Sequence, residues 1–350
     1  MRYIKKFNEA VGLAEATLPL IDLITDDYRN YINEFLKPDG KKEPLTKEYN
    51  SEDLKSFINS DLWSKFPVIS MKVDYSATVI TDDEFKNRYP KTYLYKNWNT
   101  SGACYNIGDK ESDGSYLMDP INDKEPKNLH LRLEVGCIIS DKFNNIDEMM
   151  IEAESAISHE LNHAYEGWNR ILSGSGQLSV DLTFALDANR PRLRKEIWKT
   201  WYNKIGFYLY WSELHEVNAM IQESWSFVKK MDLDELKTKS PSWKYAQMMT
   251  EFKADDFKKE MEEKVKEFYP EADVNFFLKS LKTGLANQLI KSRVDSKLTH
   301  QDKPSITGDK VKNMSVDQFL KYTEKRVNLA GETIKKGIMR LYSLKNNNVK

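Results

Sequence analysis

The hydrophobic residues of the N-terminal part recur at intervals of three and four, which is the period of a helix. This pattern runs from residue 1 to about residue 36, and the turn-forming sequence Pro-Asp-Gly at 38–40 then ends it. Ser51 is a suitable N-cap for a second helix. We therefore expect residues 1–66 to form an N-terminal helical region, and this region shows no residues arranged for chemistry.

Beyond Pro67 the pattern changes to alternation of apolar and polar residues, which predicts half-buried strands. One alternating segment runs from residue 71 to 79 and a second from residue 129 to 137. Between them, residues 97–114 form a polar, glycine-containing region, and residues 116–118 suggest one more short strand. The pattern predicts a small sheet.

A helical period returns near residue 145 and is found in most of the remaining chain. The first of these helices should end near Leu172, before a Ser-Gly-Ser-Gly sequence, and residues 177–191 should be irregular. The helical pattern resumes near Arg192 and continues to about Lys230. From Met231 onward the chain is expected to be entirely helical.

These patterns predict an α+β protein that is mostly helical. With 350 residues the chain exceeds the usual size of one compact core, so two or three lobes are expected. We divide it into the N-terminal helical region at 1–66, a mixed core at 67–231 and a C-terminal helical region at 232–350.

Composition and charge limit the kinds of binding partner and the cellular compartment that we expect. The net charge is −1, which gives no reason to expect nucleic acid or a membrane as a partner. The most apolar run, residues 205–211, is too short to span a bilayer, and the charged start does not resemble a secretory signal. The two cysteines, Cys104 and Cys137, do not form a CxxC pair. We expect a protein of a reducing, cytoplasmic compartment.

The chemistry is concentrated in one helix, which carries His159, Glu160 and His163 in the spacing HExxH. Residues four apart lie on one face of a helix, so the two imidazoles can bind one zinc ion together. Glu160 then lies beside the open position of the metal, where a carboxylate can take a proton from water. Only five histidines occur in the chain, so this spacing is rarely produced by chance.

A catalytic zinc usually has three protein ligands, and the third must come from elsewhere. The metzincin pattern is excluded, because its Gly and His positions hold Glu166 and Asn169 here. The segment from Glu216 to Ala219 resembles the Glu-x-x-Ala third-ligand segment of gluzincin peptidases. One departure is Met220, which stands where several gluzincins place an Asp, and this leaves the carboxylate that orients a ligand histidine unassigned.

The resemblance implies a zincin-like catalytic core within residues 67–231, with a small sheet packed on the HExxH helix. It also implies that one Zn²⁺ is bound by His159, His163 and Glu216, and that the edge strand of the sheet pairs with an extended peptide. Glu213 remains a rival, either as the third ligand or as the residue that orients a ligand histidine.

Some roles stay open between several residues. Glu166 is a weaker rival as a ligand, because it lies on the HExxH helix itself. Hydrolysis also needs a group that stabilises the oxyanion, for which His215 and Tyr210 are candidates. For either one, a packed aromatic residue or a surface histidine is the plainer interpretation.

The function predicted on these grounds is a zinc metalloendopeptidase, with Glu160 as general base and a peptide or protein as substrate. The alternative is a non-catalytic zincin-like module that binds partners or serves as a structural component of a larger assembly. The Lys- and Asn-rich composition resembles proteins of large tailed phages and other mobile elements, and residues 13–16 resemble a prohead-protease cleavage site. A virion-associated protein is therefore the alternative to a cytoplasmic one.

Overall fold

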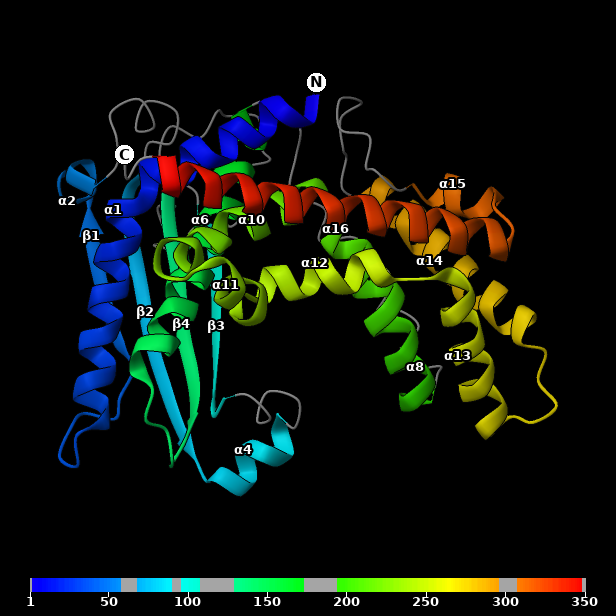
Figure 1. Ribbon diagram of the computed structural model, residues 1–350, viewed down its shortest axis with the longest axis horizontal. Coiled ribbons are helices and arrows are strands. Elements are labelled where there is room, and N and C mark those ends of the chain that lie inside the picture. Colours follow the sequence, from blue (N-terminus) through cyan, green and yellow to red (C-terminus); the bar gives the residue numbers. More distant parts are fainter. Residues whose placement is uncertain are drawn as a thin grey trace. The chain divides into compact units, whose positions relative to one another are not determined.

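The computed structural model describes residues 2–57, 68–89, 96–107, 129–172, 194–295 and 307–347. These residues are mostly helical and include a small, mixed, four-stranded sheet (Figure 1), which confirms the predicted α+β class.

The chain forms two compact units, each assembled from segments far apart in the sequence. Unit 1 contains residues 1–169, 218–236 and 340–350, and unit 2 contains residues 170–217 and 237–339. The division into three consecutive regions at residues 66 and 231 stays a prediction.

The sheet belongs to unit 1 and has the strand order β1-β2-β4-β3. Its strands are β1 (Leu45–Asn50), β2 (Val68–Ile80), β3 (Trp98–Ile107) and β4 (Leu129–Ser140). The central strands β2 and β4 are parallel, and the edge strands β1 and β3 are each antiparallel to their neighbour.

The two predicted strands are confirmed as β2 and β4, whereas β1 and β3 were not recognised in the sequence. β3 lies inside the polar region at 97–114, where the sequence Asn-Thr-Ser-Gly at 99–102 carries little strand signal. Its backbone pairs with β4 from Trp98 to Ile107, and Trp98 at its start is buried in the core. The suggested strand at 116–118 lies outside the described residues.

One face of the sheet is buried and the other is polar. The buried rows consist of alternating residues of β2 and β4, from Met71 to Tyr75 and from Leu131 to Cys137. The residues between them face the opposite side, where Arg132 Nε lies 2.8 Å from Asp74 Oδ2. Such alternation is typical of a sheet with a single covered face.

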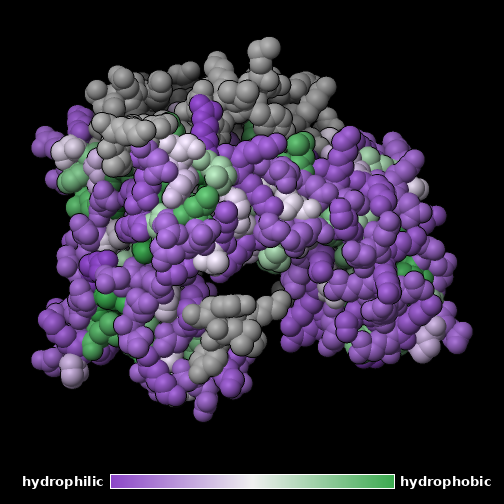
Figure 2. Space-filling view, in the orientation of Figure 1, coloured by the Kyte–Doolittle hydropathy of each residue, from purple (hydrophilic) through white to green (hydrophobic). Residues whose placement is uncertain are grey.

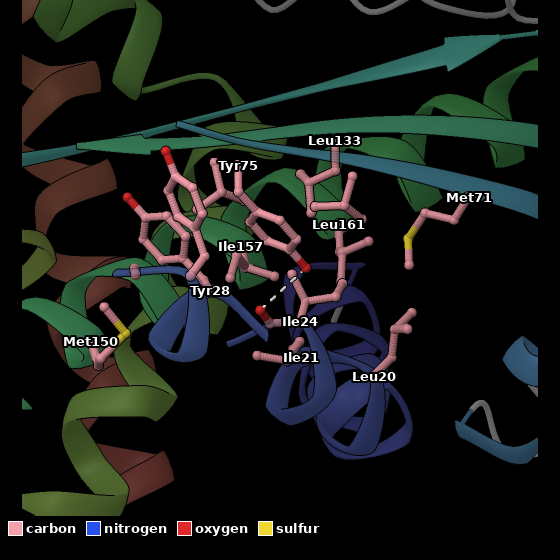
Figure 3. Close-up of a cluster of buried hydrophobic side chains, with 14 of the residues drawn as sticks. Leu20, Ile21, Ile24, Tyr28, Met71, Tyr75, Leu133, Met150, Ile157 and Leu161 are labelled. Atoms are coloured by element: carbon pink, nitrogen blue, oxygen red, sulfur yellow. Dashed lines mark hydrogen bonds between the residues drawn. The ribbon is translucent and has the colours of Figure 1, made fainter. Parts of the chain in front are cut away.

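Helices α1 (Arg2–Leu36) and α6 (Ile146–Leu172) contribute to the core on the buried face. Figure 3 shows Ile24 of α1, Tyr75 of β2 and Ile157 of α6 in one cluster, and the Tyr75 hydroxyl donates to the Ile24 carbonyl over 3.4 Å. The predicted N-terminal helix is confirmed and runs through Pro19. The short helices α2 (Ser51–Phe57) and α4 (Asp82–Arg88) complete this N-terminal part.

The second half of the chain is helical where the structure describes it, as predicted. Its helices are α8 (Lys195–Trp201), the π-helix η2 (Tyr202–Gly206), α9 (Phe207–Trp211), α10 (Leu214–Lys230), α11 (Leu233–Lys239), α12 (Pro241–Glu251), α13 (Ala254–Phe268), α14 (Val274–Asp295), α15 (Gly308–Asn313) and α16 (Val316–Asn347).

Two helix starts carry side-chain caps. Ser240 accepts a hydrogen bond from the Trp243 amide at the start of α12. Ser315 and Gln318 form a reciprocal capping box before α16, with distances of 3.1 and 2.8 Å. The helix expected to run from Arg192 to Lys230 is interrupted, because α9 ends at Trp211 and α10 begins at Leu214.

The surface seen in Figure 2 is dominated by hydrophilic residues, with hydrophobic residues in small separate groups. Within the described part of the chain, no helix has the combination of length and apolar character needed to cross a membrane.

A buried carboxylate links α6 to the C-terminal end of α10 in unit 1. Glu154 of α6 lies 2.7 Å from Lys229 Nζ and 2.6 Å from Lys230 Nζ. Burial alone would raise the pKa of Glu154, but the two lysines outweigh it and hold that pKa below its usual range. The ionised carboxylate therefore stabilises the packing of the two helices.

We predict that Glu154→Gln lowers the free energy of unfolding at pH 7 by about 1.5–3 kcal/mol, the usual range for a hydrogen bond to a charged group. Because the folded pKa is lowered, this contribution is complete above the unfolded pKa and is lost as the pH falls through the folded value. Urea denaturation at pH 7 and at an acid pH below the folded pKa of Glu154 measures both effects. Glu48→Gln, at an exposed position of β1, is the matched control, and an equal loss at both pH values would contradict the assignment.

Candidate metal centre

Helix α6 presents the HExxH residues on a well-fixed backbone. Ile157, Leu161 and Ala164 are buried in the core of unit 1. His159, Glu160 and His163 are only partly buried. The apolar stripe thus anchors the helix, and the rotation that buries it directs the polar motif residues away from the core.

The two histidines point at a common position. Their Nε2 atoms are 2.9 Å apart, and their ring planes are nearly perpendicular, at 83°. His159 also places its Nδ1 atom 2.7 Å from a carboxylate oxygen of Glu223, on α10. This partner favours the tautomer with the proton on Nδ1, which leaves the Nε2 lone pair available for a metal.

The third member of the group is Glu216, in the first turn of α10. Helix α10 is continuous from Leu214 to Lys230. The contact between Glu223 and His159 therefore helps to position the helix that also carries Glu216. The two glutamates are seven positions apart, which is about two turns of helix and places both on the same face.

A carboxylate oxygen of Glu216 and one ring nitrogen from each of His159 and His163 all lie within 4.8 Å of one another. Tetrahedral zinc with bonds of about 2.0–2.1 Å needs its ligand atoms about 3.3 Å apart. Small side-chain rotations bring the three atoms to that spacing, and two imidazoles with one carboxylate are a ligand set that suits zinc. The residues therefore fit the metal predicted from the sequence.

Glu216 is almost completely buried, with 1% of its surface exposed, and its neighbour His215 is also buried. His215 Nε2 lies 3.3 Å from Glu216 Oε1, and the ring of Tyr210 meets the His215 ring edge-on with centroids 6.2 Å apart. His215 therefore lies directly beside the Glu216 carboxylate. The predicted role of His215 or Tyr210 as oxyanion donor stays a prediction.

Glu213, the rival third ligand, does not belong to the group of converging ligand atoms. It immediately precedes α10, and its carbonyl accepts the first helical hydrogen bond from Val217 over 3.0 Å. Its carboxylate lies 2.8 Å from Arg326 Nη2. Arg326 also donates to the Ser212 side chain and carbonyl, so it holds the turn that starts α10. The side chain of Glu166, the weaker rival, lies outside the described residues.

Glu223 is the site residue that the sequence analysis missed. Met220 occupies the position from which an Asp was expected to orient a ligand histidine, and Met220 is buried. Glu223 supplies that carboxylate one turn later on the same helix. Its spacing of seven residues from Glu216 is the only signal in the sequence that could have identified it.

The edge strand β3 approaches the motif helix at Gly102. A Cβ atom at this position would lie 3.1 Å from Glu160 Cγ and 3.5 Å from Ala156 Cβ, so a larger side chain would displace the Glu160 side chain. Glu152 of α6 fixes the start of β3, since it accepts hydrogen bonds from Lys96 and from Trp98 Nε1, the latter over 3.0 Å. Glu160 therefore lies against the backbone of the edge strand.

Comparison with known proteins identifies no relative. No family model matches the chain, and no curated protein and no solved structure matches it either. The case for the centre comes from the converging side chains of α6 and α10.

We predict that Glu223→Gln lowers the affinity for zinc about 10- to 100-fold, as expected when the hydrogen-bond partner of a ligand histidine is weakened. Competition with a chromogenic chelator measures the affinity. Glu235→Gln, at an exposed position of α11, is the control and should bind zinc as the wild type does. Equal affinities for all three proteins would mean that Glu223 does not orient His159.

Proposed function

We propose that the chain is a zinc-dependent metallopeptidase of gluzincin type, with a zincin-like core formed by the sheet, α6 and α10. The observation that carries the proposal is the convergence of His159, His163 and Glu216 within 4.8 Å. Three protein ligands are the number that leaves a fourth position open at a catalytic zinc. A purely structural site usually has four protein ligands.

Zinc held at this position would polarise a peptide carbonyl and make a water molecule acidic near neutral pH. Glu160 follows His159 directly in α6 and is partly exposed, so its carboxylate can accept the proton of the attacking water. The same carboxylate then returns the proton to the nitrogen that leaves when the peptide bond breaks. Glu160 therefore serves as base first and as acid second.

The edge strand β3 supports an extended peptide as the substrate. One side of β3 pairs with β4, and the strand order leaves its other side at the edge of the sheet. A peptide that adds to an edge strand forms backbone hydrogen bonds without regard to its side chains. Because Gly102 brings the β3 backbone against Glu160, a peptide bound along this edge would pass close to the proposed base.

We predict that Glu160→Gln retains zinc but lowers the rate of casein hydrolysis about 10²- to 10⁴-fold, the contribution usual for a general base. The amide keeps the size of the side chain but cannot take up the proton. Zinc content by atomic absorption and release of fluorescent casein peptides are measured on the same preparation. His159→Ala should lose both properties. Hydrolysis at the wild-type rate by Glu160→Gln would refute the role of Glu160.

A further inference from the structure

A pocket of about 280 Å³ lies within unit 2, between α9, the C-terminal end of α12 and the first turns of α13. None of its lining residues belongs to the candidate metal centre. Lys204, on its wall, is part of the π-helix η2, and π-helical turns recur at functional sites. The volume is below that of pockets for drug-sized ligands and suits a single long side chain.

Three aromatic residues provide an apolar surface in this pocket: Tyr208, Phe252 and Phe257. Each is at most 5% exposed. The rings of Tyr208 and Phe252 meet edge-on with centroids 5.3 Å apart, and the Phe252 and Phe257 centroids are 6.2 Å apart. The rings are therefore held in place by one another, and their surface is fixed before a ligand arrives.

The Tyr208 hydroxyl is the one uncharged polar group among the side chains that line the pocket. Within the described ranges of the chain it has no hydrogen-bond partner, although Tyr208 lines the pocket. Burial raises the pKa of Tyr208, and the nearby charges of Glu260 and Glu251 raise it further. The hydroxyl thus lies close to two carboxylates without bonding to either, and its oxygen can accept a hydrogen bond from a ligand.

The charges of the pocket favour a cation. Its lining contains the carboxylates of Glu251, Asp256 and Glu260 and the ammonium groups of Lys204 and Lys253, which leaves a net charge of −1. Lys204 Nζ lies 3.1 Å from Glu260, so these two charges largely cancel. One positive charge would neutralise the site.

We propose that this pocket binds the side chain of a lysine or arginine from another polypeptide. The hydrocarbon stem of such a side chain would lie on the aromatic rings. Its charged head would face Glu251 and Asp256 and donate to the Tyr208 hydroxyl. The proposal does not depend on the proposed peptidase activity.

Ligand-observed NMR titration of the full chain at low ionic strength tests this proposal. The probes are three acetylated, amidated tripeptides, Gly-Arg-Gly, Gly-Lys-Gly and Gly-citrulline-Gly, of which the last is neutral but has the shape of the arginine peptide. Both basic peptides should bind, and the citrulline peptide should bind at least fivefold more weakly. Equal binding of the arginine and citrulline peptides would overturn the proposal.

Substitutions locate the binding. Asp256→Asn should weaken the arginine peptide about two- to fivefold, in line with an exposed ion pair, and Tyr208→Phe should weaken it as well. Asp255→Asn is the matched control, because Asp255 is also in the first turn of α13 but pairs with Lys321 at 3.0 Å. An equal loss in Asp255→Asn and Asp256→Asn would show a general charge effect and contradict a site in the pocket.

Discussion

The burial of one face of helix α6 is the constraint on which the candidate centre depends. Met150, Ile157 and Leu161 lie in the core of unit 1 (Figure 3), and each buried side chain of this size contributes about 1.5–3 kcal/mol. Rotating the helix would expose this stripe, so its orientation is strongly fixed. Because residues four apart share a face, the same orientation directs His159 and His163 together toward α10.

Helix α10 contacts α6 through charged and hydrogen-bonding side chains. Near its middle, Glu223 contacts His159, and at its C-terminal end Lys229 and Lys230 hold Glu154. These contacts lie on different turns of α6 and pair groups of opposite charge or complementary hydrogen bonding. They fix the register of α10 along α6, and the register determines that Glu216, rather than a neighbouring carboxylate, approaches the two imidazoles.

The sequence predicts the features that are encoded locally. Strands β2 and β4 follow from alternation, and the HExxH helix follows from its period, because both bury long apolar rows. β3 was missed because the polar sequence at 99–102 interrupts the alternation of apolar residues. The break before α10 was also missed, because Arg326, which holds the turn at Ser212, is 114 residues away in the sequence. Glu223 was missed for the same reason, as its role depends on the distant His159.

The measurement that tests the central claim most directly is the zinc content of the purified, reconstituted chain beside that of Glu216→Ala and Glu213→Ala. A three-ligand centre formed by His159, His163 and Glu216 predicts about one zinc per wild-type chain, a large loss in Glu216→Ala and retention in Glu213→Ala. Absence of zinc from the wild type after reconstitution, or an equal loss in both variants, would contradict the centre described here.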